Sequence, residues 1–153
     1  MRITKENINE FIKGTKLLFY NKNVTHIDYI PEGITDIECW NNELTKLPKL
    51  PNSLNFLDCS NNKLTEIPIL PDNLEHLNCY DNKLTKLPKL PDVLRSLECD
   101  ENELTELPKL PNTLLHLYCS HNNLPYEITL DNLKEHNTLI KRKNILEKIR
   151  LYH

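Results

Sequence analysis

Five cysteines recur at intervals of twenty residues along this chain, and this spacing constrains its fold more than any other feature. They are Cys39, Cys59, Cys79, Cys99 and Cys119. The same residues return around each of them: the unit that starts at Leu54 reads L-x-x-L-x-C-x-x-N-x-L-T-x-I-P-x-L-P, and the unit that starts at Leu74 repeats it with Leu for Ile. Such a period predicts a fold in which one structural unit stacks on the next and both ends need caps.

The centre of each unit has the alternating pattern of a short β-strand. Leu57 and Cys59 alternate with Asp58 and Ser60, so we expect the first two side chains to point inward and the other two outward. Equivalent strands twenty residues apart would pair side by side in a parallel sheet. Each unit therefore contributes one strand to a continuous sheet.

Two prolines in each unit determine the return path behind the strand. Pro68 and Pro71, for example, exclude a regular helix there and favour an extended or polyproline-like run. The predicted fold is an α/β-type, right-handed solenoid with a parallel concave sheet, an extended convex side and helical caps.

Two repeated polar or reactive residue types have structural explanations. An asparagine follows each cysteine by three residues, where its amide can satisfy backbone groups of the turn. These asparagines are Asn42, Asn62, Asn82, Asn102 and Asn122. The five cysteines lack the C-x-x-C spacing of a zinc site, and parallel neighbouring side chains have poor disulfide geometry. We therefore expect buried, reduced thiols and a reducing compartment such as the cytoplasm.

The amino-terminal residues depart from the repeat. In residues 1–14 we expect a helical cap over 4–13, with Thr4 as its N-cap and Gly14 as its end. Its apolar face consists of Ile8, Phe11 and Ile12. Residues 15–30 form a degenerate first unit with Lys22 in place of asparagine, which suits a terminal position.

The regular repeats cover residues 31–124, and residues 125–153 form a second cap. From Thr129 to Arg150 the apolar spacing becomes helical, and either one helix or two, with a restart at Thr138, fits the pattern. The residues expected to cover the last unit are Leu130, Leu133, Leu139, Ile140, Leu146 and Ile149. The basic residues here indicate either a solvated helix face or an acidic partner. They are Lys141, Arg142, Lys143, Lys148 and Arg150.

The outward positions of the sheet are the ones that the repeat leaves free for function. Exposed aromatic residues among carboxylates are typical of a protein-binding surface. The candidate anchors are Trp40, Phe56, Tyr80 and Tyr118. His76 lies among them, and the candidate steering charges are Glu38, Asp58, Asp81, Glu98, Asp100 and Glu101. The strip is acidic and the convex side is richer in lysine, so we expect a protein partner with a basic surface. The alternative is that these charges only keep the sheet soluble.

Composition excludes several other classes of function. The net charge of −3 gives no reason to bind nucleic acid, no apolar stretch is long enough to span a membrane, and the amino terminus lacks a secretory h-region. His76, His116 and His121 with Asp100 make only a weak metal site, because strands of alternate units lie far apart. We predict no cofactor, no metal and a monomer.

The whole pattern resembles the leucine-rich repeat signature, with cysteine at a position that usually carries leucine. Its Leu-Pro-x-Leu-Pro doublet at 47–51, 87–91 and 107–111 is similar to the short repeats of bacterial effectors of the YopM and IpaH type. Similar repeat proteins occur in giant DNA viruses, and the Asn- and Lys-rich composition of this chain resembles the viral proteins more than the bacterial effectors. The resemblance implies a non-catalytic module that binds a host or self protein on its concave sheet.

The resemblance also raises an enzymatic alternative. In the IpaH type, a separate carboxy-terminal domain with a Cys-x-Asp motif transfers ubiquitin, and Cys79-Tyr80-Asp81 matches those three letters. However, Cys79 occupies an inward strand position, and the residues after Leu124 are too few for such a domain. We therefore predict no enzyme, with a passive assembly protein and a substrate-recruiting ligase fragment as the alternatives.

Overall fold

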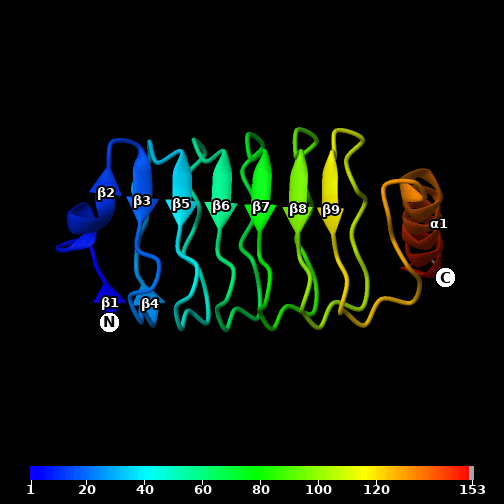
Figure 1. The fold of residues 1–153 in the computed structure, drawn as a ribbon. Helices are drawn as coiled ribbons and strands as arrows, with labels where there is room; N and C mark the ends of the chain where they lie inside the picture. Colours follow the sequence, from blue (N-terminus) through cyan, green and yellow to red (C-terminus); the bar gives the residue numbers. More distant parts are fainter. Residues whose placement is uncertain (152–153) are drawn as a thin grey trace.

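The computed structural model describes residues 1–151 as one row of coils stacked along a single axis (Figure 1). Each coil contributes a short strand to a seven-stranded sheet with the order β2, β3, β5, β6, β7, β8, β9. Their bounds are Ile12–Lys13, Lys16–Leu18, Asp36–Glu38, Phe56–Asp58, His76–Asn78, Ser96–Glu98 and His116–Tyr118. From β3 to β9 every neighbouring pair is parallel, with partners twenty residues apart. The predicted parallel solenoid is confirmed.

The inward positions of every unit form one continuous apolar core. Leu57 and Cys59 are fully buried, and Leu64, Ile67 and Leu70 fill the space behind them. All five cysteines are buried with free thiols, as expected.

Two serines at outward positions of the sheet, Ser60 and Ser96, are buried rather than exposed. Ser60 lies on the same side of the sheet as Asp58, so its predicted direction holds although neighbouring groups cover it. Its hydroxyl donates a hydrogen bond of 2.6 Å to Asp58 Oδ1, which draws this small side chain against the sheet.

The asparagine ladder connects successive coils. Asn62 Nδ2 donates to the carbonyl oxygens of Cys39, Cys59 and Ser60 at 3.0–3.1 Å, and its Oδ1 accepts the N–H of Leu44 at 3.0 Å. Asn42, Asn82, Asn102 and Asn122 have the equivalent bonds. Each amide thus satisfies backbone groups in its own unit and in the preceding one.

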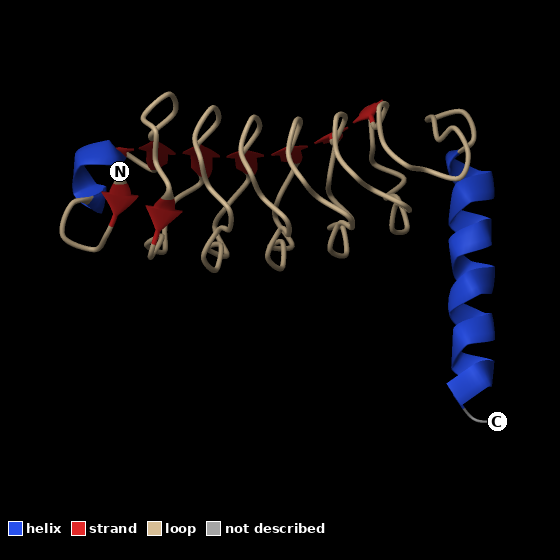
Figure 2. Ribbon diagram, turned by 90° about the horizontal axis from the view of Figure 1, so that it is seen from below, coloured by secondary structure: helices blue, strands red, loops and turns tan. Residues whose placement is uncertain are grey.

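The return segments behind the sheet contain no helix within the repeats, as Figure 2 shows. Each return ends in a turn that the second proline begins: the carbonyl of Pro51 accepts the N–H of Leu54 at 3.2 Å, and Pro71 and Leu74 repeat this bond at 3.1 Å. Proline suits this position because its carbonyl can accept although its nitrogen cannot donate. The expected extended return path is confirmed.

The amino-terminal cap differs from the predicted helix over residues 4–13. Only Ile8–Phe11 is helical, as the 3-10 helix η1. The strands β1, Arg2–Ile3, and β2, Ile12–Lys13, flank it. Gly14 has a φ of 62° and turns the chain, so that β2 pairs antiparallel with β3. The chain favours strands here because β1 and β2 can satisfy backbone groups of the first coil that an isolated helix would leave unpaired.

Residues 15–30 form the first coil and resemble the later ones in their core. The short strand β4, His26–Ile27, pairs in parallel with β1. Phe19 occupies the position that cysteine has in the later units, and it is 1% exposed. Its ring and the Phe11 ring form an edge-to-face pair with centroids 6.3 Å apart. The backbone N–H of Lys22, which replaces asparagine, donates to Asn42 of the next coil at 3.1 Å.

Over residues 125–151, the carboxy-terminal cap contains a single helix, α1, Leu133–Leu151. Thr138 lies inside it and donates its hydroxyl to the carbonyl of Lys134, so there is no second helix start. His136, only 2% exposed, lies within hydrogen-bond distance of Tyr126 Oη and of the Pro108 carbonyl, at 2.8 and 3.0 Å. These contacts attach the first turns of α1 to the last coils.

The remainder of α1 projects past the return side of the solenoid (Figure 2). The expectation that six apolar residues of the second cap cover the last unit is correct for the buried Leu133 and is wrong for four of the six. Leu130, Leu139, Leu146 and Ile149 are exposed, with Ile140 intermediate. The strap of residues 125–130, whose Ile128 is buried, performs much of this covering instead. Of the basic residues, Lys143 forms an ion pair with Glu106.

Candidate functional site

The outward side chains of the strands, together with the two residues that follow each inward cysteine, form one surface, which we call the sheet face. Parallel pairing in register aligns equivalent positions in columns across the strands. One column contains Asp36, Phe56, His76, Ser96 and His116, and the next contains Glu38, Asp58, Asn78, Glu98 and Tyr118. Trp40, Tyr80, Asp81, Asp100 and Glu101 follow the strands in the same order. The candidate residues therefore share one side of the molecule.

An aromatic pair lies at the amino-terminal end of the sheet face. The rings of Tyr20 and Trp40 stack with their centroids 4.7 Å apart and an angle of 3° between their planes. Sequence reasoning missed Tyr20, although it precedes Trp40 by one repeat interval, because the first coil carries Phe19 where a cysteine would mark the register. The stack holds Trp40 flat and partly exposed.

The other aromatic residues are more separate. The rings of Phe56 and His76 lie 6.0 Å apart with a tilt of 40°. Tyr80 and Tyr118 are 38% and 53% exposed, so both present ring surface to solvent. Exposed tyrosines of this kind can bury a large area in an interface at little cost in side-chain entropy.

The carboxylates of the sheet face differ in how they are held. Asp58 accepts hydrogen bonds from the N–H and hydroxyl of Ser60, at 3.0 and 2.6 Å. Asp100 accepts the same pair of bonds from Ser120, at 2.9 and 2.6 Å. Sequence reasoning missed both serines, since hydroxyl partners are not specified by the repeat pattern. Each aspartate keeps its charge fixed above the sheet.

Glu98 lies close enough to both aspartates to be affected by their charges. Desolvation by burial, followed by the charges of Asp58 and Asp100, raises the pKa of its carboxyl, while His116 and His76 act in the opposite direction. Within residues 1–151, the ion pairs include none of Glu38, Asp58 and Glu98. Their negative charge is thus available to a partner.

Other charges near this surface have partners within the chain. Lys16 Nζ lies 3.1 Å from Asp36 Oδ1 at the amino-terminal end. Glu101 Oε1 lies 3.6 Å from His121 Nδ1 at the other end, a contact that becomes an ion pair when the histidine is protonated. Free carboxylates therefore concentrate in the middle of the sheet face.

The geometry does not support the weak metal site considered above. Among residues 1–151, no group of three or more His, Cys, Asp or Glu side chains, including His76, His116, His121 and Asp100, is arranged to hold a metal ion. Equivalent residues of alternate strands are separated by a full strand, which is too far for shared ligation. In the same residues, no helix has the length and apolarity to cross a membrane.

The cysteines are poorly suited to nucleophilic chemistry. Burial raises the pKa of Cys59, Cys79 and Cys99 well above the ordinary thiol value. Since the thiolate is the reactive form, Cys79 in its Cys-Tyr-Asp triplet is a filler of the core, with 0% of its surface exposed. Cys119 at the end of the array is the least shielded, and burial together with Asp100 and Glu127 raises its pKa to about 11.

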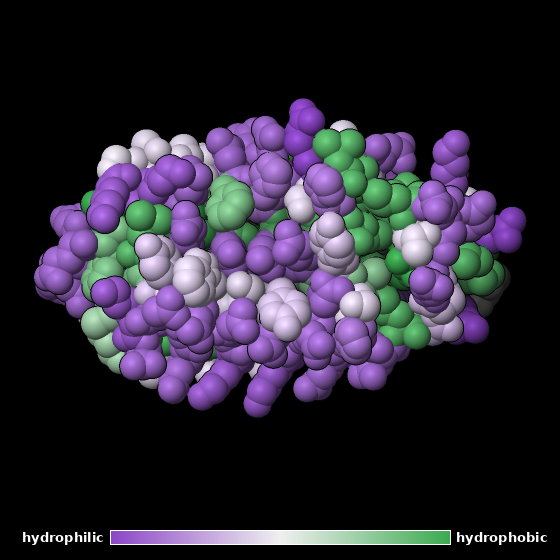
Figure 3. All heavy atoms as spheres, viewed as in Figure 1, coloured by the Kyte–Doolittle hydropathy of each residue, from purple (hydrophilic) through white to green (hydrophobic). Residues whose placement is uncertain are grey.

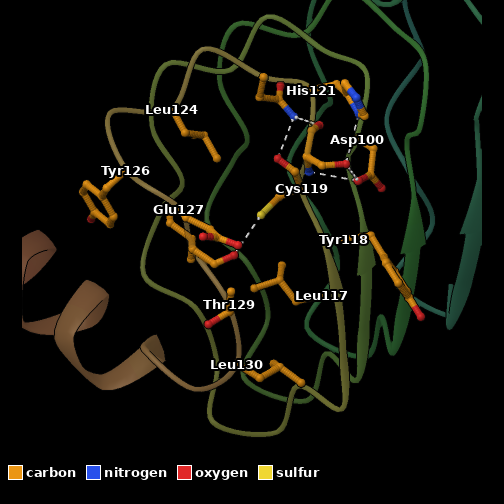
Figure 4. A pocket seen from close by; sticks show the side chains of 13 residues that line it. Asp100, Leu117, Tyr118, Cys119, His121, Leu124, Tyr126, Glu127, Thr129 and Leu130 are labelled. Carbon is orange, nitrogen blue, oxygen red and sulfur yellow. Dashed lines mark hydrogen bonds between the residues drawn. The ribbon is translucent and has the colours of Figure 1, made fainter.

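A groove that sequence reasoning did not anticipate lies between β9 and the strap of residues 125–130 (Figure 4). We call it the end groove; its volume is about 490 Å³. Leu117, Leu124 and Leu130 contribute apolar walls, while Asp100 and Glu127 contribute carboxylates. No sequence signal indicated it, because it depends on where the strap leaves the last coil.

Comparisons with known proteins agree with this architecture. The family described as Leucine Rich Repeat matches residues 53–72. A solved structure of a Shigella effector LRR domain is 35% identical, with a TM-score of 0.74, and the match covers 83% of this chain and 57% of that one. No curated protein matches the sequence.

Two structures of YopM, a leucine-rich effector protein, are also similar. The protein from Yersinia enterocolitica is 27% identical with a TM-score of 0.55 over 75% of this chain. The protein from Yersinia pestis is 33% identical with a TM-score of 0.53 over 70% of this chain. The chain spans only 30% and 36% of these two proteins.

Proposed function

Because this chain is a solenoid of leucine-rich repeats like those of the Shigella and Yersinia effectors, we propose that it is a non-catalytic module that binds a protein with a basic surface on its sheet face. One observation carries the proposal: Glu38, Asp58 and Glu98, which have no ion-pair partner within residues 1–151, lie in one column beside exposed aromatic rings. Charged groups of one sign around aromatic anchors suit recognition of the opposite charge.

The aromatic residues supply the contact area in this proposal. The Trp40 ring is held by its stack on Tyr20, and the Tyr80 ring is 38% exposed. Lysine or arginine side chains of a partner can approach both the rings and the neighbouring carboxylates, which combines cation–π and ionic attraction. The carboxylates then act mainly on the association rate and on selectivity.

The remaining parts of the proposal concern the state of the protein. The five free, buried thiols favour a reducing compartment, such as the cytoplasm of the producing cell or of a host cell. The net charge of −3 disfavours nucleic acid as a partner. We expect a monomer, which sedimentation analysis would distinguish from a passive assembly protein that associates with itself.

Affinity capture with mass spectrometry would identify the partner, and a double substitution would test the site. We expect Trp40→Ala with Tyr80→Ala to weaken partner binding at least about tenfold, because two anchors are removed. The control is Tyr29→Ala, since Tyr29 is 39% exposed and lies outside the sheet face. Undiminished binding by a double variant with an unchanged circular dichroism spectrum would reject the assignment.

Charge reversal tests the electrostatic part separately. Glu38→Lys and Glu98→Lys should slow association and reduce its dependence on salt. Glu66→Lys, on the return side, is the matched control because it changes net charge equally. Equal effects of all three substitutions would show that only the overall charge matters.

A further inference from the structure

The carboxy-terminal edge of the sheet differs from every internal strand in its backbone hydrogen bonds. In each internal unit the N–H of the cysteine donates to the next strand: Cys39 to Asp58 and Cys99 to Tyr118, both at 2.8 Å. Within the described chain, the N–H groups of Cys119 and His121 donate to no backbone carbonyl. The edge of the last unit therefore presents unpaired donors in strand geometry.

The asparagine ladder is incomplete at the same place. The carbonyl of Cys99 accepts hydrogen bonds from two side-chain amides, those of Asn102 and Asn122. Among the described residues, the carbonyl of Cys119 accepts from the Asn122 amide alone. The N–H of Leu104 donates to Asn122 Oδ1 at 2.9 Å. In the part of the chain that the structure describes, no equivalent amide accepts the N–H of Leu124, because the residue twenty positions after Asn122 is Arg142 in α1.

The end groove lies along this unfinished edge. Cys119, Leu124 and the apolar side chains of Leu117 and Leu130 line it (Figure 4). Viewed from the sheet side, hydrophobic surface gathers between β9 and α1, whereas much of the sheet face is hydrophilic (Figure 3). The carboxylates of Asp100 and Glu127 give the groove a negative rim. Space, apolar walls and charge thus coincide with the unpaired backbone.

We propose that the end groove binds an extended segment of a partner protein, which adds to β9 as an eighth, parallel strand. The segment has the form apolar-x-apolar-x-x-Asn and carries a nearby lysine or arginine. Its backbone accepts hydrogen bonds from the N–H groups of Cys119 and His121, and its apolar residues enter the groove. Its asparagine donates to the carbonyl of Cys119 and accepts the N–H of Leu124, while its basic residue faces Asp100 and Glu127. This is strand addition with a side-chain amide as the specificity element.

A second copy of the chain is a poor occupant. Every internal strand already has two neighbours, and β2 covers the edge of β3 in antiparallel orientation. Within residues 1–151, a free copy therefore has no parallel strand whose amino-terminal side is unpaired. The groove's negative rim selects instead for a partner with basic residues.

A synthetic peptide that copies residues 54–65 provides a direct probe, since it has the required pattern and contains a lysine. A fluorescein-labelled form, kept under reducing conditions, should bind the full chain saturably in fluorescence anisotropy. In the peptide, Asn62→Ala should weaken binding about tenfold by removing two hydrogen bonds. Asn61→Ala, at the adjacent outward position, is the control and should have little effect. Asp58→Lys should strengthen binding because the rim is acidic.

Variants of the chain locate the peptide. Leu130→Trp places a bulky ring at the groove and should reduce peptide binding at least about tenfold. Ile69→Trp is the control, because Ile69 is 88% exposed on the return side. Amide exchange of Cys119 and His121 should slow when the peptide is bound.

Two results would overturn the proposal: no saturable binding of any of these peptides, or equal weakening by Asn61→Ala and Asn62→Ala. The Trp40→Ala and Tyr80→Ala double variant should retain full peptide binding. The proposal for the end groove can therefore be rejected or supported independently of the proposal for the sheet face.

Discussion

The two ends of the solenoid differ in how completely the terminal strand is paired and the core beside it is covered. At the amino-terminal end, β2 pairs with the edge of β3, and Ile3, Ile8 and Phe19 are at most 3% exposed. At the carboxy-terminal end, the outer edge of β9 has no strand neighbour among residues 1–151, and Leu115 on the last coil is 58% exposed.

The difference separates two requirements of a stacked fold. An end must cover the apolar core, and it must also satisfy the backbone of the terminal strand. The amino-terminal cap covers the core and also pairs with the backbone of β3. The strap and α1 mainly cover the core, through the buried Ile128 and Leu133. An edge left unpaired is either a liability or a binding site.

The largest expected contrast between the ends is in stability. Phe19→Ala should lower the free energy of unfolding by about 3–5 kcal/mol, because it opens a cavity in the closed end. Leu146→Ala in the projecting part of α1, where the side chain is 59% exposed, should change it by no more than about 0.5 kcal/mol. Urea denaturation of both variants measures the contrast. Similar losses would show that α1 packs more closely than described.

The accessibility of the thiols gives a second contrast. Cys119 should react with a maleimide under native conditions at least about tenfold faster than the other cysteines, because it is least shielded and its thiolate forms most readily. Mass spectrometry after timed labelling identifies the modified residue. Labelling in denaturant provides the control, since all five should then react alike. Faster reaction of Cys39 would mean that the amino-terminal end opens first.

The turns after the strands also differ along the array. Asn41 and Asn61 adopt φ values of 52°, which asparagine tolerates, whereas Glu101 and His121 adopt 54° and 50°. Glu101→Asn should therefore stabilise the protein by about 0.5–1 kcal/mol, because longer side chains are strained in this left-handed region. Glu103→Asn, two residues later, is the control and should give no gain. The melting temperature is the measurement, and an unchanged value would indicate that these turns carry no strain.

The smallest effect concerns the charges of the sheet face. Asp36 near the closed end is paired with Lys16, whereas burial, followed by the charges of Asp58 and Asp100, raises the pKa of Glu98. A carboxyl with a raised folded-state pKa costs stability as it ionises, so stability should fall as pH rises from the ordinary value of 4.5 through the folded pKa. Glu98→Gln should remove this slope and gain at most about 0.5 kcal/mol at neutral pH. Glu66→Gln should leave the slope intact in pH-dependent unfolding.

The repeated part of the fold could be predicted from the sequence because the same residue type recurs at the same position in several units. Cys59 or Leu57 alone would be ambiguous, but their recurrence fixes strand, register and inward direction together. The same redundancy identified the asparagine ladder and the positions of the sheet face.

The unrepeated parts could not be predicted in the same way. Residues 4–13 have a helical apolar spacing, yet pairing with the first coil favours β1 and β2. The apolar stripe of α1 indicated a covering helix, but the attachment through His136 and Asn137 directs it away from the solenoid. Contacts such as Tyr20 with Trp40 and Ser120 with Asp100 depend on side-chain geometry that a single sequence does not specify.

The identical register at each internal junction has a consequence for how such a chain can change in length. The bonds that join β5 to β6 recur between β6 and β7 and between β7 and β8. Loss or duplication of one whole coil would therefore recreate a junction that already exists, and no new packing surface would be needed. Insertion of a single residue would instead shift the register between neighbouring strands. The gene can therefore lengthen or shorten this protein in steps of one coil.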